Sequence, residues 1–205
     1  MSEQLGLFGE TEDQEAPKPV KVVSGPRVLF FDLETQKSAE EVGGWGNIHK
    51  MGLAVGGVWD SLDGEFFTYE EKDARQLVDK LRTADLVVGF NVIGFDYTVL
   101  QPYSDFDLQE INTFDMLVDV KKQLGFRLSL NHLAQHTLNA EKSADGLVSL
   151  QWYKEGKINK IIQYCKQDVE ITRDLFLFGE KNGYVNYLSR SGNPLQLKVN
   201  WKTAL

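Results

Sequence analysis

The pattern of hydrophobic and polar residues predicts a succession of strands and helices from residue 28 onward. Short apolar runs rich in β-branched and aromatic residues are typical of strands, and they occupy 28–31, 51–59, 65–69, 85–90 and 111–114. Apolar positions that recur every three or four residues are typical of helices, and they occur over 73–83, 95–103, 117–120, 129–138, 147–156 and 158–181. Asp73 is expected to cap the first helix. Alternating segments at 184–188 and 195–201 predict a closing hairpin.

The order of these elements predicts an α/β fold. The runs at 51–59 and 65–69 flank the short turn 60–64, so they are expected to form a hairpin. The later strands alternate with helices, and such connections return the chain beside the strand from which it started. We therefore expect a mixed central β-sheet with 28–31 at its centre and α-helices on both faces.

The N-terminal segment has a different composition from the rest. Residues 9–26 are rich in Glu, Pro, Gly and Lys and contain few large apolar residues. Such a segment cannot bury enough apolar surface to offset the entropy of ordering. We expect a disordered tail over 1–26 and one folded domain over 27–205, a length that a single core can fill.

The net charge of −8 decides neither for nor against a nucleic-acid partner. Residues 1–26 contain five acids and two lysines, so they carry −3 of this charge. Four carboxylates described below contribute most of the remainder, and two divalent cations would neutralise them. The rest of the domain would then be close to neutral.

Composition also limits the location and the chemistry. No stretch is long and apolar enough to span a membrane, and the first residues do not resemble a signal peptide, so we expect a cytoplasmic protein with no membrane partner. Cys165 is the only cysteine and cannot form an internal disulfide or a cysteine-based zinc site. His49, His132 and His136 are too scattered to indicate a dedicated metal cluster.

Asp32 and Glu34 directly follow the apolar run 28–31. In a strand, residues two apart project to the same face, so the two carboxylates are expected to lie side by side. Adjacent carboxylates repel each other unless they share a cation, and hard oxygen ligands suit Mg²⁺ or Mn²⁺. Taken alone, such a pair more often represents solvated acids at the end of a strand.

A second group, from Asn91 to Asp96, follows the predicted strand 85–90. This strand is expected to lie beside the first one, so the loop would turn Asp96 toward the same edge of the sheet. Taken alone, the group is equally well interpreted as capping of the next helix by Asn91 and Asp96.

A third group, Tyr164 and Asp168, lies inside the predicted helix 158–181. A spacing of four residues places the phenol and the carboxylate on one helical face, one turn apart. Taken alone, the two residues are better explained as a packed tyrosine beside a surface acid.

Together, the three groups resemble the DEDDy branch of the 3′–5′ exonucleases in the ribonuclease H-like superfamily. The pattern is Asp-x-Glu, Asn-x-x-x-Phe-Asp and Tyr-x-x-x-Asp, in this order, and the chain from Arg27 to its C-terminus is most similar to the YprB-type family. The segments NTFDMLVDV, WYKEGKI and YCKQDVEITRDLFLFG resemble that family too. A sister branch has a histidine five residues before the last aspartate, where this chain has Gln163.

The resemblance implies a ribonuclease H-like fold and hydrolysis with two divalent cations, Mg²⁺ or Mn²⁺. Asp32 is expected to bridge both cations, with Glu34 and Asp168 completing the first site and Asp96 holding the second. Tyr164 is expected to orient the attacking water. Two cations about 3.5–4 Å apart can stabilise the attacking and the leaving oxygen together.

Asn91, Trp45 and Lys142 are weaker candidates for substrate binding. Trp45 lies in a Gly-rich loop over 36–50 and could stack on a terminal base, or it could equally anchor its own loop. Lys142 could reach a phosphate, although a lone lysine is usually solvated. Asp115 is expected to cap the helix that follows it rather than to bind metal.

A separate signal lies at 4–8. Gln4, Leu5, Leu7 and Phe8 resemble the Gln-Leu-x-Leu-Phe peptide by which bacterial proteins bind the replication sliding clamp. A chance apolar cluster in a disordered tail is an equal alternative.

Three functions are compatible with these patterns. The first is a 3′–5′ exonuclease acting on single-stranded 3′ ends, with DNA favoured over RNA because of the clamp-like peptide and with a role in DNA replication or repair. The second is an RNA 3′-processing exonuclease, since the four acids do not recognise the 2′-hydroxyl. The third is an inactive nuclease-like interaction module, which would be expected to lack one or more of the ligands that are present here.

Overall fold

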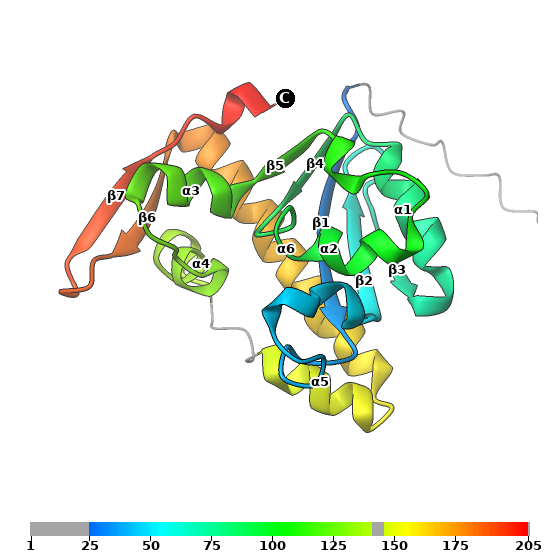
Figure 1. Ribbon diagram of the computed structural model, residues 1–205. Coiled ribbons are helices and arrows are strands. Elements are labelled where there is room, and N and C mark those ends of the chain that lie inside the picture. Colours follow the sequence, from blue (N-terminus) through cyan, green and yellow to red (C-terminus); the bar gives the residue numbers. More distant parts are fainter. Residues whose placement is uncertain (1–24, 141–145, 205) are drawn as a thin grey trace, which may run out of the picture.

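The computed structural model describes residues 25–140 and 146–204 of the chain (Figure 1). The predictions for the peptide at 4–8 and for Lys142 lie outside the described residues. A five-stranded sheet forms the centre and helices lie on both of its faces, so the predicted α/β fold class is confirmed. In the described part of the chain, no helix is both long enough and apolar enough to cross a membrane.

The central sheet is mixed and has the strand order β3-β2-β1-β4-β5. β1 (Val28–Thr35) pairs antiparallel with β2 (Leu53–Asp60), which pairs antiparallel with β3 (Glu65–Glu70). On its other side β1 runs parallel to β4 (Leu86–Gly89), which runs parallel to β5 (Thr113–Asp115). The predictions of a central first strand and of the hairpin that follows it are confirmed.

Helices connect these strands and cover the sheet. They are α1 (Ala74–Arg82), α2 (Asp96–Leu100), α3 (Met116–Leu124), α4 (Leu130–Leu138), α5 (Gly146–Lys154) and α6 (Ile158–Asn182). The long α6 crosses the sheet on the face opposite to α1 and α2 (Figure 1). After α6, β6 (Tyr184–Leu188) and β7 (Pro194–Lys198) form the predicted antiparallel hairpin.

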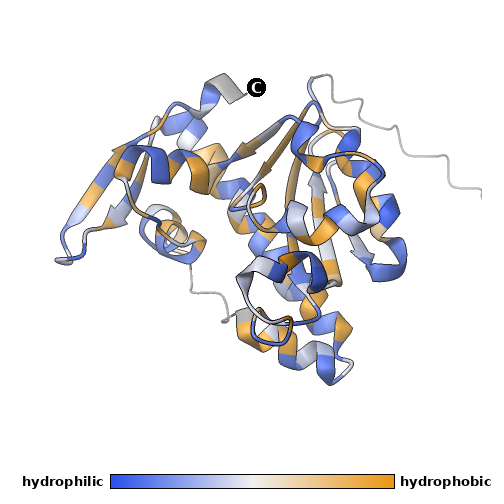
Figure 2. Cartoon of the chain, viewed as in Figure 1, coloured by the Kyte–Doolittle hydropathy of each residue, from blue (hydrophilic) through white to orange (hydrophobic). Residues whose placement is uncertain are grey.

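Alternate residues of β1 pack into two different cores. Leu29, Phe31 and Leu33 belong to a cluster with residues of α1 and α2. Val28 and Phe30 belong to a cluster with residues of α6. Hydrophobic residues (orange in Figure 2) concentrate along the central strands, and hydrophilic residues (blue) are frequent on the outer helices. Because successive strand residues project to opposite faces, the even-numbered residues of β1 face α6.

A glycine allows α6 to approach the sheet closely beside Asp32. Gly57 of β2 is the register partner of Asp32. A Cβ atom at position 57 would lie 2.8 Å from Cys165 Sγ on α6 and 2.8 Å from Phe66 Cζ. Interiors are already close-packed, so a larger residue at this position would push α6 away from β1. The lack of a side chain at position 57 therefore brings α6 within reach of the acidic end of β1.

Three local features differ from the sequence-based predictions. β1 extends through the acidic pair to Thr35, because β2 remains paired with it along this stretch. The predicted loop 36–50 contains a 3-10 helix, η1 (Trp45–Lys50), which has no buried residue and therefore no apolar periodicity. Asp73 occupies the N-cap position of α1, but its side chain makes no capping hydrogen bond.

Candidate active site

Asp32 and Glu34 project from the last part of β1 toward α6. They continue the even-numbered series of Val28 and Phe30, whose side chains pack into the cluster that contains α6 residues. Antiparallel pairing with β2 fixes the backbone of both acids. The two carboxylates therefore lie on the face of the sheet that α6 covers.

Asp168 brings a third carboxylate to this face from α6. One carboxylate oxygen each from Asp32, Glu34 and Asp168 lies within 4.8 Å of the other two. Neighbouring residues hold this turn of α6 on the sheet. Val169 packs into the core, and the Cys165 thiol donates a hydrogen bond to the carbonyl oxygen of Asp32 at 3.5 Å. Residues from opposite ends of the domain thus meet in one cluster of oxygen donors.

Asp96 approaches the acidic end of β1 from the start of α2. Its side chain is buried, and its Oδ1 accepts a hydrogen bond from the backbone N–H of Leu33 at 3.1 Å. Leu33 lies between Asp32 and Glu34 in β1, so this hydrogen bond holds Asp96 beside these two acids. The fourth predicted acid is therefore close to the cluster of three, although it does not belong to the 4.8 Å group.

Burial raises the pKa values of Asp32, Glu34 and Asp96. For Asp32 it is the largest cause of a pKa well above the ordinary value, followed by the charges of neighbouring acids, first Asp96. Burial also raises the pKa of Glu34 to about 8, against the opposing effect of a hydrogen bond from Ser149. The pKa of Asp96 is raised to about 8 by burial. Without a cation the site therefore retains protons at neutral pH, and a cation would compete with them.

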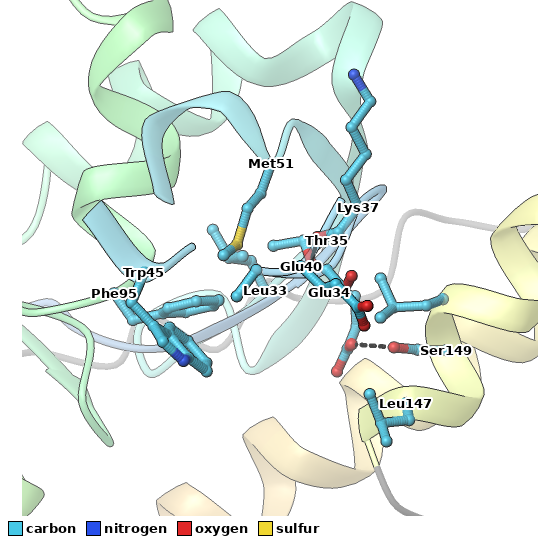
Figure 3. A pocket seen from close by; sticks show the side chains of 13 residues that line it. Leu33, Glu34, Thr35, Lys37, Glu40, Trp45, Met51, Phe95, Leu147 and Ser149 are labelled. Atoms are coloured by element: carbon cyan, nitrogen blue, oxygen red, sulfur yellow. Dashed lines mark hydrogen bonds between the residues drawn. The ribbon is translucent and has the colours of Figure 1, made fainter. Parts of the chain in front are cut away.

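Ser149 of α5 holds Glu34 in place. Its Oγ donates a hydrogen bond to Glu34 Oε2 at 2.5 Å (Figure 3). Ser149 is buried, so water does not compete for the Glu34 oxygen from that side. Nothing in the sequence around Ser149 indicates this partner, because the contact depends on how α5 packs against β1.

Asp115 organises the loop that precedes Asp96. Its Oδ1 accepts a hydrogen bond from the backbone N–H of Asn91 at 2.8 Å, and its Oδ2 accepts one from Ile93 at 3.1 Å. Oδ1 also accepts from backbone N–H groups in the first turn of α3, so the predicted capping role of Asp115 is confirmed. The hydrogen bonds between Asp115 and the loop could not be predicted from the sequence, because Asp115 is far along the chain from Asn91 and Ile93.

Asn91 has a different role from capping. The residue at the N-cap of α2 is Phe95, so the interpretation of Asn91 as its cap is wrong. Asn91 has a φ of 70°, a left-handed conformation that asparagine tolerates better than most residues. Its Oδ1 accepts a hydrogen bond from Arg127 Nη2 at 3.0 Å. Arg127 lies between α3 and α4 outside any recognisable motif, so sequence analysis does not identify it.

Tyr164 lies one turn before Asp168 on α6, where helical geometry places both side chains on one face. Its side chain is almost buried, and its ring packs edge-on against Trp152 of α5, with 6.3 Å between the ring centroids. Tyr164 also lines a surface hollow together with Gln163. The ring is therefore held between α5 and α6 and still reaches the surface.

A cavity of about 600 Å³ opens beside Glu34 (Figure 3). Most of its lining is apolar, with contributions from Met51 and Phe95 on one side and from Leu147 on α5. Trp45 lies at its rim, 71% exposed, with its ring 6.4 Å from that of Phe95. The Trp45 ring packs against Phe95 and is largely exposed, an arrangement compatible with both predicted roles, a contact with a base and the anchoring of its own loop. The predicted stacking of a base on the solvent-facing side of the Trp45 ring stays a prediction.

The donor set fits a divalent cation that prefers oxygen ligands. Three carboxylates within 4.8 Å of one another offer hard oxygen atoms around a common point. A thiolate contribution is not available, because burial raises the pKa of the Cys165 thiol well above its ordinary value and the thiol is directed to a backbone carbonyl. The chemistry of these residues favours a hard divalent cation over softer metals.

Comparison with known proteins agrees with the fold. Among curated proteins no sequence matches this chain. In solved structures the chain is similar to the family B DNA polymerase from the hyperthermophilic archaeon Pyrobaculum calidifontis, with 18% sequence identity and a TM-score of 0.56. The match covers 89% of this chain and 27% of the polymerase chain, so this likeness concerns the fold alone. A family model of the RNase H superfamily matches residues 29–177, from β1 to most of α6. Because this match spans more than half of the chain, the protein belongs to the RNase H superfamily.

Proposed function

We propose that the protein is a divalent-metal-dependent 3′–5′ exonuclease of the DEDDy type that degrades single-stranded nucleic acid, DNA in preference to RNA. The observation that carries this proposal is the convergence of Asp32, Glu34 and Asp168 within 4.8 Å of one another. The hydrogen bond from Leu33 to Asp96 adds the fourth acid beside them. Membership of a superfamily whose members are generally metal-dependent nucleases gives further support.

Each acid has a separate task in the proposed reaction. Asp32 would contribute to both cation sites, Glu34 and Asp168 would complete the first site, and Asp96 would hold the second cation. When bound, two divalent cations would polarise the phosphodiester and lower the pKa of a water molecule. The hydrogen bond from Ser149 to Glu34 and the backbone bond to Asp96 support these carboxylates from outside. Such outer contacts orient ligands before the substrate binds.

Tyr164 orients the attacking water in this proposal. Its position one turn from Asp168 supports the role, because the two side chains share one face of α6. Packing of the ring against Trp152 restricts its motion, which is what a positioning group requires.

The cavity beside Glu34 supports action at the end of a strand. Its volume of about 600 Å³ is in the range of small-ligand sites and exceeds what one nucleotide needs. Its apolar lining and the ring of Phe95 suit an unpaired base, whose faces are free for contact. A base that remains stacked in a duplex could not offer these faces. A terminal nucleotide bound there would have its phosphodiester next to the acids.

The substitution Asp32→Asn tests the assignment of the acids. It removes one negative charge and keeps the size of the side chain, so hydrolysis is expected to fall at least about 100-fold, a barrier increase of about 2.7 kcal/mol. The free energy of unfolding should not fall, because like-charge repulsion is relieved. The assay follows single-stranded DNA and RNA labelled at the 3′ or the 5′ end, with Mg²⁺ or Mn²⁺. A 3′ label should appear at once in mononucleotides, whereas a 5′ label should pass through a ladder of shorter products.

The matched control for this assay is Asp79→Asn, which removes an exposed acid on α1 and should leave turnover unchanged. Ordinary turnover by Asp32→Asn would contradict the metal-site assignment. Immediate release of a 5′ label would contradict the direction of degradation while leaving a nuclease function intact.

The substitution Tyr164→Phe tests the water-positioning role. It removes one hydroxyl and keeps the ring that packs against Trp152, so stability and metal affinity should change little. The turnover number is expected to fall by about 10- to 100-fold, with KM nearly unchanged. Tyr153→Phe on α5 is the control, since it makes the same chemical change away from the acids. If Tyr164→Phe turns over at the rate of the unmodified protein, Tyr164 is a packing residue.

The raised pKa values predict how the stability of the metal-free protein depends on pH. Glu34 titrates near 4.5 when unfolded and near 8 when folded, so between these values the folded chain holds a proton that the unfolded chain has lost. The free energy of unfolding must therefore decrease as pH rises through this window. Asp96, whose pKa is also raised to about 8, acts in the same direction.

Thermal unfolding of the metal-free protein at about pH 7 and about pH 9 measures this effect, with an expected loss of at least about 3 °C at the higher pH. Saturating Mn²⁺ should abolish the loss, because the cation binds the deprotonated acids. Glu34→Gln should reduce the loss in the metal-free protein. A melting temperature that is independent of pH and Mn²⁺ in this range would contradict the proposed metal site.

We also propose that residues 4–8 dock the protein on a bacterial sliding clamp, which supports DNA as the substrate. The support is the sequence of Gln4, Leu5, Leu7 and Phe8. A short peptide loses conformational entropy on binding, so a dissociation constant in the micromolar range is expected, roughly −8 kcal/mol. Calorimetry with the clamp of the source organism measures it. Deletion of residues 1–10 should remove binding and spare hydrolysis of free oligonucleotides, and equal binding by Leu7→Ala/Phe8→Ala would contradict the docking.

A further inference from the structure

A second hollow shares the aromatic pair Trp45 and Phe95 with the cavity beside Glu34. It has a volume of about 370 Å³ and is lined by both aromatic residues, by Asn91 and by Arg127. The same two aromatic residues also line the cavity beside Glu34. The Trp45–Phe95 pair therefore forms a wall common to the cavity beside Glu34 and to this second hollow, which contains an arginine.

Arg127 differs from Arg27 and Arg75 in its electrostatic partners. Arg82 and Arg190 also lack an ion pair in the described chain, but they lie over the rings of Phe106 and Phe126. Arg27 pairs with Asp60 at 3.1 Å, and Arg75 pairs with Asp105 at 3.5 Å. Within residues 25–140 and 146–204, no carboxylate lies within ion-pair distance of Arg127. Its guanidinium instead donates a hydrogen bond to the neutral amide oxygen of Asn91. The residues that the structure describes therefore do not neutralise the guanidinium charge, and an arginine in this state is well suited to bind phosphate.

The backbone on both sides of Arg127 is anchored. Phe126 and Leu128 pack against the core cluster that contains α6 residues. The side chain between them is exposed and is oriented by Asn91, whose left-handed backbone is held by the hydrogen bond from its N–H to Asp115. The same carboxylate thus positions the loop before Asp96 and the asparagine that orients Arg127. A guanidinium held in this way loses less conformational entropy on binding than a freely rotating one.

Trp45 completes the hollow with an exposed aromatic surface. Its side chain is 71% exposed, the largest value among the exposed large hydrophobic residues of the described chain. The exposed indole lies beside an arginine in this hollow, and a base stacked on it would cover its free surface. Bases stack on aromatic rings irrespective of their identity, so this surface suits a nuclease without sequence preference.

We propose that Trp45, Phe95 and Arg127 form a second nucleotide subsite, which binds the nucleotide immediately upstream of the 3′-terminal one. Arg127 holds a backbone phosphate of the single strand, and the base of that nucleotide stacks on Trp45. The shared aromatic wall gives the strand a continuous path from this hollow to the cavity beside Glu34. This inference rests on the proposed exonuclease function, because it assigns a direction to the strand.

The substitution Arg127→Gln tests the phosphate contact through the salt dependence of binding. Affinity is measured by fluorescence anisotropy with a 5′-labelled single-stranded DNA of roughly 10 nucleotides, whose 3′-terminal linkages are phosphorothioates to slow hydrolysis, in the presence of Mn²⁺. Loss of one phosphate contact should weaken binding about 10-fold at low salt. It should also reduce the slope of log K against log salt by about 0.7, the value for one contact to a single strand. A purely structural defect would not change that slope by one contact.

Two further variants separate the parts of the subsite. Arg75→Gln makes the same change of charge at an exposed arginine that Asp105 already pairs, and it should retain the affinity and the slope of the unmodified protein. Trp45→Ala should weaken binding about 10-fold with an unchanged slope, and Trp45→Phe should restore most of the affinity, because stacking is not ionic. Thermal unfolding confirms that each variant is folded before it is compared.

An unchanged salt slope in folded Arg127→Gln would overturn the subsite, even if the unmodified protein hydrolyses oligonucleotides normally. Hydrolysis is followed separately with an all-phosphate oligonucleotide. If the unmodified protein binds the strand through Arg127 and does not hydrolyse it, the exonuclease proposal fails while the phosphate contact stands.

Discussion

The mutual repulsion of buried carboxylates is the constraint on which the rest of the structure depends. Two ionised carboxylates at about 4.8 Å repel each other by roughly 3 kcal/mol at the effective dielectric constant of a protein surface. Burial adds to this cost, which is why the pKa of Asp32 is well above its ordinary value and that of Glu34 is about 8. Such a cluster persists only where the surrounding fold holds it and where protons or cations neutralise it.

The surrounding fold provides that hold from several directions. Pairing of β1 with β2 fixes two acids on one face, and the absence of a side chain at Gly57 lets α6 bring Asp168 close to them. The backbone N–H of Leu33 holds Asp96 beside the acidic end of β1, and Asp115 fixes the loop that leads to Asp96. The acids thus depend on main-chain contacts with three strands and two helices, so their arrangement is set before any ligand binds.

Patterns among residues close in sequence made most of the fold predictable, whereas the four acids were identified from the resemblance of three separate groups to the exonuclease pattern. The alternation in β1 predicted the common face of Asp32 and Glu34, and the spacing of four on α6 predicted the common face of Tyr164 and Asp168. The bonds from Ser149 to Glu34 and from Arg127 to Asn91 join residues far apart along the chain, and only the packing of α5 and of the α3–α4 connection creates them. The sequence did not predict helix η1, because none of its residues is buried and its apolar positions therefore show no helical periodicity.

Crystals soaked in Mn²⁺ and measured with anomalous X-ray scattering test most directly whether these acids form a metal site. A peak in contact with carboxylate oxygens of Asp32, Glu34 and Asp168 is expected, with a second peak between Asp32 and Asp96. In crystals of Asp32→Asn both peaks should weaken or disappear. Manganese bound only elsewhere on the protein, or an acid cluster that remains free of metal at saturating Mn²⁺, would contradict the assignment.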